Sequence, residues 1–196
     1  MHFMIRKGKI IIISGPSGSG KTTLYKKLLA DETIKRKIIK TISATTRPPR
    51  PGERHGRDYF FLSPKEFLAR KKAGYFLESQ KVFDNYYGTP EKNVRRLLGK
   101  GKNVLLCIDV KGAKVVCRKF PEAVRIFINV PSLTVLRKRL EARGSESKKI
   151  IQLRLKTARK EVKEIKNYTH IVVNVQLERA HQILKNIILS ELTPLA

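Results

Sequence analysis

Residues Gly15 to Thr22 read GPSGSGKT and match the pattern G-x-x-x-x-G-K-[ST] without a mismatch. In this pattern the glycines let the main chain curl around an anion. We expect Gly15, Gly18 and Gly20 to adopt φ values that are closed to other residues, which turns successive N–H groups toward a β-phosphate. Lys21 would reach the β- and γ-phosphates, and Thr22 offers a hydroxyl to Mg²⁺, the cation that accompanies a nucleoside triphosphate. The sequence therefore predicts a site for a nucleotide phosphate, with Mg²⁺ as cofactor.

The segments on either side of this loop support the interpretation. Upstream, residues 9–14 (KIIIIS) form a β-branched run with the length of a strand buried on both faces. Downstream, residues 22–30 place Leu24 and Leu28 four residues apart, so a helix begins where the loop ends. The alternative is a glycine-rich turn that binds nothing, and the strand–loop–helix order argues against it.

The remainder of the chain reads as an α/β protein with a parallel sheet. Strands are expected at 38–44, 58–62, 75–83, 104–109, 123–130 and 170–174; a turn at 84–88; and helices at 63–74, 89–99, 112–120, 132–143, 148–166 and 177–192, with a hinge at 144–147. Ser63 and Glu66 are in register for a capping box at the start of the helix 63–74. The segment 36–89 interrupts the regular alternation with short strands and turns. We interpret it as an inserted subdomain that binds the second substrate.

Composition limits the class of protein. The 196 residues suffice for one domain with inserts, no apolar stretch is long enough to cross a membrane, and the N-terminus lacks the features of a secretory signal. Cys107 and Cys117 lie in apolar segments without disulfide or metal-ligand spacing, so a reducing cytoplasm is expected. The net charge of +27 attracts polyanions, but recognised RNA- and DNA-binding motifs are absent. Nucleic acid is therefore expected to bind non-specifically, if at all.

A carboxylate ends one of the predicted strands. The apolar run Val104 to Ile108 is followed by Asp109, an arrangement that in phosphate-loop proteins places an Asp near the metal. An Asp at a strand end also often caps the next turn. With the phosphate loop present, we favour a role for Asp109 at the metal or at the acceptor.

Several motifs together closely resemble guanylate kinase over nearly the whole chain. Besides the phosphate loop they are SATTRPPRPGE (43–53), GRDY (56–59), FLE (76–78), NYYGT (85–89), Ile108-Asp109 and the set Pro131-Ser132, Arg139-Leu140, Arg143-Gly144 and Arg154. The resemblance implies transfer of the ATP γ-phosphoryl group to GMP, by a single domain that is a monomer or homodimer. It implies a phosphate-loop kinase core at 1–35, 90–130 and 168–196, a mixed α/β GMP-binding subdomain at 36–89 and a short helical lid at about 131–167.

The resemblance also assigns roles to individual residues. ATP would be bound by Gly15, Pro16, Ser17, Gly18, Ser19, Gly20, Lys21, Thr22, Thr23 and Asn174. GMP would be bound by Ser43, Arg47, Arg50, Tyr59, Glu78, Tyr87, Thr89 and Asp109. Catalysis would rest on Lys21, Arg47, Asp109 and the lid arginines Arg139, Arg143 and Arg154. The chemistry fits these roles, because guanidinium groups suit a phosphate dianion and a carboxylate can accept both N1–H and N2–H of guanine.

The chain departs from the family pattern at two places. Cys107-Ile108-Asp109 stands where the family usually has D-I-D, and Asn174-Val175-Gln176 where it has N-D-D. The first bears on turnover and the second on the preference for ATP as donor. Three other functions are compatible with parts of the sequence: a guanylate-kinase-like module that binds peptides, a basic nucleic-acid-binding NTPase, and a kinase acting on a sugar phosphate. The intact phosphate loop and the guanine-reading set Ser43, Glu78 and Thr89 favour the kinase of GMP.

Overall fold

The structure is a computed structural model that describes residues 7–142 and 147–193. Arg143 and most of the predicted hinge therefore lie outside the described residues. Its contacts divide the chain into two compact units. The first unit comprises Met1–Ile10, Ile39–Leu106 and Lys111–Ala123, and the second comprises Ile11–Ile38, Cys107–Val110 and Val124–Ala196.

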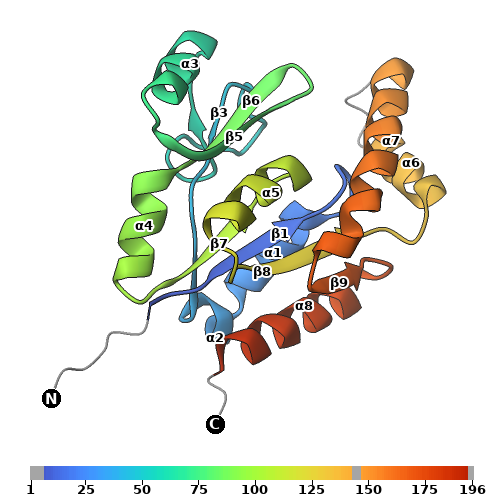
Figure 1. Ribbon diagram of the computed structural model, residues 1–196. Coiled ribbons are helices and arrows are strands. Elements are labelled where there is room, and N and C mark those ends of the chain that lie inside the picture. Colours follow the sequence, from blue (N-terminus) through green and yellow to red (C-terminus); the bar gives the residue numbers. More distant parts are fainter. Residues whose placement is uncertain (1–6, 143–146, 194–196) are drawn as a thin grey trace, which may run out of the picture. The chain divides into compact units, whose positions relative to one another are not determined.

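Two sheets organise the fold (Figure 1). The five-stranded sheet has the order β2-β7-β1-β8-β9, formed by β1 (Ile10–Ser14), β2 (Ile38–Lys40), β7 (Asn103–Cys107), β8 (Val124–Asn129) and β9 (His170–Val173). Its β1–β8 and β8–β9 pairs are parallel, as the alternation of strands and helices predicts. The four-stranded sheet has the order β4-β3-β6-β5, formed by β3 (Ala44–Thr45), β4 (Phe60–Phe61), β5 (Phe76–Val82) and β6 (Asn85–Pro90). It is mixed, with one parallel pair, β3–β4.

The helices follow the predicted order with small changes at their ends. They are α1 (Lys21–Ala30), α2 (Glu32–Lys35), α3 (Pro64–Lys72), α4 (Glu91–Gly99), α5 (Val110–Lys119), α6 (Leu133–Glu141), α7 (Lys148–Val162) and α8 (Leu177–Leu192). The capping box expected at Ser63 and Glu66 is present at the start of α3. The predicted helix over 148–166 ends earlier, because its last turn tightens into the 3₁₀ helix η1 (Lys163–Asn167).

The core of the second unit forms around β1. Ile11, Ile12 and Ile13 are fully buried, which confirms the prediction of a strand covered on both faces. A separate apolar cluster joins α6 to α7, formed by Val130, Leu136, Leu140, Ile151, Leu155 and Ala158. The two helices are therefore held as a pair by packing rather than by their exposed basic side chains.

Two predicted elements are wrong in the segment 36–89. The expected strand 38–44 is two strands, β2 and β3, which belong to different sheets. The expected turn at 84–88 is instead most of β6, and the turn is only Phe83 and Asp84, with Phe83 at φ 55°. The Asn and Gly of that stretch favour a turn by propensity, but Tyr86 and Tyr87 pair across the hairpin with Lys81 and Gln80.

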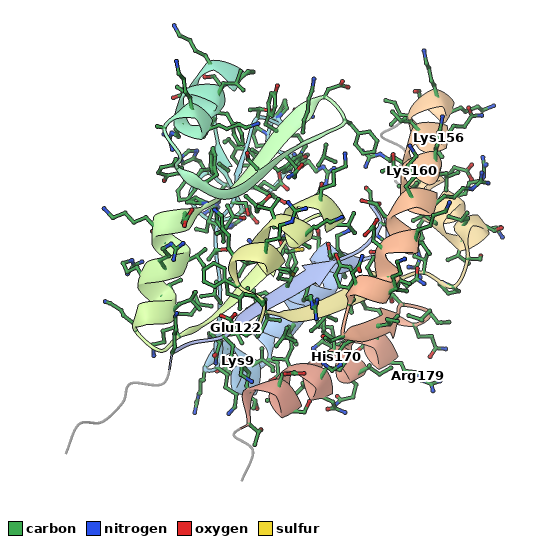
Figure 2. The ribbon with its side chains drawn as sticks, in the orientation of Figure 1. Lys9, Glu122, Lys156, Lys160, His170 and Arg179 are labelled. Carbon is green, nitrogen blue, oxygen red and sulfur yellow. The ribbon has the colours of Figure 1, made fainter. Side chains whose placement is uncertain are left out.

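Basic side chains are exposed on separate elements. Lys156 and Lys160 on α7 and Arg179 on α8 are all exposed, and Figure 2 shows them along these two helices. Of the helices that the structure describes, none combines the length and apolar character needed to span a bilayer.

Candidate active site

The phosphate loop has the backbone that its sequence predicts. Gly15, Gly18 and Gly20 have φ values of 139°, 92° and 92°, all in the region that disfavours side chains. Gly15 is also fixed by space, because a Cβ there would collide with the carbonyl oxygen of Ile128 on β8. Among the residues that the structure describes, no side chain caps the first turn of α1. Its N-terminal N–H groups are thus available to an anion, as the helix dipole favours.

The lysine of the motif folds back on the loop. Lys21 Nζ donates to the carbonyl oxygens of Gly15 and Pro16, at 2.6 Å and 2.9 Å. Thr22 and Thr23 are exposed on the first turn of α1. The ammonium group therefore lies at the mouth of the loop, where it can exchange these carbonyls for phosphate oxygens.

Backbone contacts in the second unit bring Asp109 to the same end of β1. The Ile108 N–H donates to the Ile13 carbonyl oxygen (3.2 Å), and Ser14 Oγ donates to the Ile108 carbonyl oxygen (2.7 Å). Asp109 is the next residue, directly before α5. It thus lies beside the point where β1 gives way to the phosphate loop, although the two are about ninety residues apart in sequence.

Two of the three predicted lid arginines contact the region of the loop. Arg154 on α7 donates from Nη1 to Ser17 Oγ at 2.6 Å. Arg139 on α6 donates from Nη2 to the Asn174 carbonyl oxygen at 2.8 Å. Asn174 in turn donates from Nδ2 to the carbonyl oxygen of Ser19 at 2.8 Å. Arg143 lies outside the described residues.

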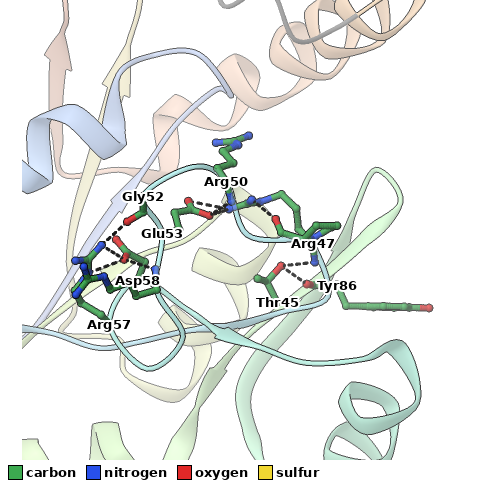
Figure 3. A network of polar contacts seen from close by, with 10 residues as sticks. Thr45, Arg47, Arg50, Gly52, Glu53, Arg57, Asp58 and Tyr86 are labelled. Carbon is green, nitrogen blue, oxygen red and sulfur yellow. Dashed lines mark hydrogen bonds and ion pairs between the residues drawn. The ribbon is translucent and has the colours of Figure 1, made fainter.

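In the first unit, Arg47 is paired with a carboxylate (Figure 3). Its Nη2 donates to both carboxylate oxygens of Glu53, at 2.9 Å and 2.8 Å, and the Arg50 N–H donates to Oε2 of the same group at 2.9 Å. Figure 3 shows the Arg50 guanidinium pointing away from Glu53. Thr45 Oγ1 accepts from the Arg47 N–H (3.2 Å) and donates to the Tyr86 carbonyl oxygen (3.0 Å), which ties the loop to β6.

The pair shifts the pKa of both groups in the direction that keeps them charged. Burial opposes the charged form of Glu53, but the Arg50 N–H and the charge of Arg47 outweigh it and lower the pKa of the carboxyl. Burial likewise opposes the charge of Arg47, whereas Glu53 and, more weakly, Tyr87 raise the pKa of the guanidinium. Both side chains are largely buried, with 13% and 17% exposed. The arginine is therefore held in one place as a cation.

Two tyrosines predicted to bind phosphate lie beside this arginine. The Arg47 guanidinium lies 5.7 Å from the centre of the Tyr59 ring, and the rings of Tyr59 and Tyr87 meet edge to face at 6.3 Å. Tyr87 belongs to β6, where it faces Thr45 of β3. Four residues from different parts of the segment 36–89 therefore lie close together: Thr45, Arg47, Tyr59 and Tyr87.

The predicted guanine-reading residues meet on the β5–β6 pair. Glu78 of β5 is opposite Thr89 of β6, and Thr89 Oγ1 donates to Glu78 Oε1 at 2.7 Å. A register shift between Phe76 and Glu78 marks a bulge at this point. Glu78 is 5% exposed and Thr89 is fully buried, so this is a buried carboxylate rather than a surface one. Ser43, the third predicted guanine-reading residue, is half-buried and lies directly before β3. Its carbonyl oxygen accepts a hydrogen bond from the Phe60 N–H at 2.9 Å.

Two contributions were not predicted from the sequence. The sequence predicts no role for Glu53 beyond its place in the motif. Its position was nevertheless a signal, because a carboxylate directly after a Pro-Gly turn can accept from an N–H of the same loop, here that of Arg50 three residues earlier. Asn174 was expected at ATP, not as a hydrogen-bond donor to the phosphate loop. No local pattern signals this contact, because Asn174 and Ser19 are 155 positions apart in the sequence.

Comparison with known proteins identifies the family. A family model described as guanylate kinase matches residues 7–191. The guanylate kinase of Caldanaerobacter subterraneus subsp. tengcongensis is 44% identical over 186 residues, covering 95% of this chain and 89% of the relative. That of Rickettsia bellii is 44% identical over 185 residues, covering 94% and 95%. The crystal structure of guanylate kinase from Anaplasma phagocytophilum matches with a TM-score of 0.78 at 33% identity, covering 96% of this chain and 88% of that one.

These matches confirm the resemblance read from the motifs and the predicted α/β fold. The chain belongs to the guanylate kinase family, whose members transfer the γ-phosphoryl group of ATP to GMP.

Proposed function

We propose that this chain catalyses the reaction of its family, ATP plus GMP giving ADP plus GDP, and that its residues divide the work between donor and acceptor. The observation that carries the choice of GMP is the buried Glu78 carboxylate, hydrogen-bonded to Thr89 on the sheet that also positions Arg47 and the two tyrosines. A buried carboxylate is stabilised by hydrogen-bond donors, and guanine presents two of them, N1–H and N2–H, on one edge.

On the donor side, the loop from Gly15 to Thr23 binds the ATP phosphates through its N–H groups and Lys21. Arg139, Arg143 and Arg154 add positive charge to the transferring group, and Asn174 belongs to the same ATP site. The acceptor is a phosphate oxygen that is already ionised at neutral pH, so the reaction needs position and charge neutralisation more than a general base.

On the acceptor side, Arg47, Arg50, Tyr59 and Tyr87 bind the GMP phosphate, and Asp109 contacts the acceptor. Glu78 accepts from N1–H and N2–H of guanine, while Ser43 donates toward the O6 side. Thr89 donates toward O6 as well once its single hydroxyl proton turns away from Glu78. Adenine has neither an N1 proton nor a 2-amino group. Glu78 therefore selects guanine over adenine by hydrogen-bond chemistry and not by size.

The residues present suit Mg²⁺. The exposed Thr22 hydroxyl, at the uncapped start of α1, and the Asp109 carboxylate are oxygen ligands of the kind that Mg²⁺ prefers, and the nucleotide phosphates supply the same chemistry. Thr22 would hold the ion, which neutralises phosphate charge when bound. We place the protein in the cytoplasm, as a monomer or homodimer that binds nucleic acid only non-specifically.

A coupled assay of ADP formation tests the proposal. ATP is supplied with GMP, AMP, UMP or no acceptor, and the proposal expects turnover with GMP well above the other three. Equal turnover without acceptor would indicate a simple ATPase. Failure of every acceptor to release ADP would favour the peptide-binding module instead, because such domains keep the fold without the chemistry.

A further inference from the structure

We infer that Asn174 is a positioning residue that holds the phosphate loop and the α6 arginine in one arrangement. This role differs from a contact with the donor base. The inference rests on the proposed function in so far as the loop binds the donor phosphates. Every residue involved lies in the second unit.

The Asn174 side chain is bonded to the loop from within the protein. It is 4% exposed, and its Nδ2 donates to the Ser19 carbonyl oxygen at 2.8 Å. Its own N–H donates to the Asn129 carbonyl oxygen of β8 at 2.9 Å, so the residue is fixed to the sheet. The loop carbonyl is thereby tied to the sheet through one side chain.

The same residue adds a steric reason to the positive φ that already favours glycine at position 20. A Cβ on Gly20 would collide with Asn174 Nδ2, so the amide occupies the space that any larger residue would need. Gly20 is followed at once by Lys21 and the first turn of α1. The hydrogen bond from the amide to the Ser19 carbonyl oxygen therefore acts on the peptide directly before Gly20 and the start of α1.

The backbone of Asn174 performs a second task. Its carbonyl oxygen accepts from Arg139 Nη2 at 2.8 Å, which places a guanidinium of α6 next to the residue that braces the loop. Asn174 thus bonds through its side chain to the phosphate loop two residues before Lys21, and through its carbonyl oxygen to Arg139. Loss of the side chain would leave the Arg139 contact in place but release the loop.

A positioning role predicts that removing the Asn174 side chain weakens nucleotide binding by the same factor whatever base the nucleotide carries. Asn174→Ala should lower kcat and weaken ADP binding, each by roughly five- to one-hundredfold, since a buried hydrogen bond to the loop is lost. UDP, whose base carries no amino group, should lose affinity by the same factor as ADP. If Asn174 instead contacted adenine, Asn174→Ala would raise the KM for ATP and leave kcat at saturation unchanged. The affinity for UDP would then stay the same.

The experiment measures kcat and KM for ATP at saturating GMP, and ADP and UDP affinities by calorimetry, for the parent and the variant. Asn186→Ala is the matched control, because it removes an exposed amide from α8 of the same unit. The inference is overturned if the variant raises only the KM for ATP and weakens only ADP binding, while kcat and the affinity for UDP stay as in the parent. If the parent transfers no phosphoryl group to GMP, the proposed function fails, and the binding measurements still decide the role of Asn174.

Asn174→Asp keeps the shape of the side chain and covers the case in which the alanine variant does not fold. An ionised carboxylate cannot donate to the Ser19 carbonyl oxygen, whereas a protonated one has an O–H that can. The kcat of this variant relative to the parent should therefore be low at neutral pH and rise as the pH falls. A ratio that does not change with pH would contradict the positioning role.

Discussion

Replacing Glu78 by Gln separates recognition of guanine from recognition of phosphate. In the structure Glu78 Oε1 already accepts from Thr89 Oγ1 at 2.7 Å, and the carboxylate is 5% exposed. Guanine then presents two donors, N1–H and N2–H, to the remaining lone pairs. Glutamine has the same shape but carries no charge, and one of its two terminal positions becomes an NH₂ group that cannot accept.

The size of the effect follows from the two bonds. A hydrogen bond to a charged group contributes about 1.5–3 kcal/mol, so altering two of them costs about 3–6 kcal/mol. At 1.4 kcal/mol for each factor of ten, this corresponds to a loss of roughly 10² to 10⁴ in kcat/KM for GMP. The free energy of unfolding should stay the same or rise, because a buried carboxylate is exchanged for a neutral amide.

Steady-state kinetics with GMP and AMP, and melting curves without nucleotide, measure both effects. Glu122→Gln is the control, because it removes an exposed carboxylate in the turn before β8 in the same type of exchange (Figure 2). ATP affinity should remain within a few-fold of the parent. If the folded Glu78→Gln protein phosphorylates GMP within a few-fold of the parent, Glu78 does not read the base and the reasoning above is refuted.

Further predictions concern the phosphate loop, pH, a helix cap and the surface charge. Lys21→Ala should stay folded and lose phosphoryl transfer by orders of magnitude, and near-normal turnover would count against the loop's role. Burial, and then the charge of Lys27, lowers the pKa of His181 from its ordinary 6.5, so stability should be constant above about pH 6.5 and fall below it, and His181→Gln should flatten this dependence in denaturant titrations. Ser63→Ala should remove about 1 kcal/mol of stability through the capping box with Glu66 and leave kcat unchanged. RNA should bind only at low salt and without sequence preference, and tight binding to one RNA at physiological salt would indicate a dedicated partner.

The sequence predicts most of the core because its signals there are local. The run of four isoleucines, the glycine-rich loop and the leucines of the first helix each determine backbone conformation within a few residues, and the structure has β1, the loop and α1 at these places. The capping box at Ser63 is equally local and is confirmed. By contrast, residues 38–45 form two strands because their partners are different sheets, which no local pattern encodes.

The parts that could not be predicted depend on pairs of residues that are distant in sequence. The hairpin of β5 and β6 uses a two-residue turn with Phe83 at positive φ, and pairing of the strands overrides the turn propensity of Asn85 and Gly88. The contact of Asn174 with Ser19 joins residues 155 positions apart. The roles assigned to the site residues themselves came from the family resemblance, and they remain predictions to be tested by the variants above.

The ion pair between Arg47 and Glu53 gives Arg47, in the loop between β3 and β4, a counter-ion from the same loop. The chain as a whole carries a charge of +27, yet this arginine, which we expect to meet GMP, is already neutralised by a neighbour six residues away. Small inorganic anions gain little by displacing a well-oriented carboxylate, whereas a nucleotide brings its base and ribose contacts as well. We therefore expect Arg47 to bind small anions weakly in the absence of nucleotide, and its contribution to substrate affinity to depend on ionic strength less steeply than the net charge suggests.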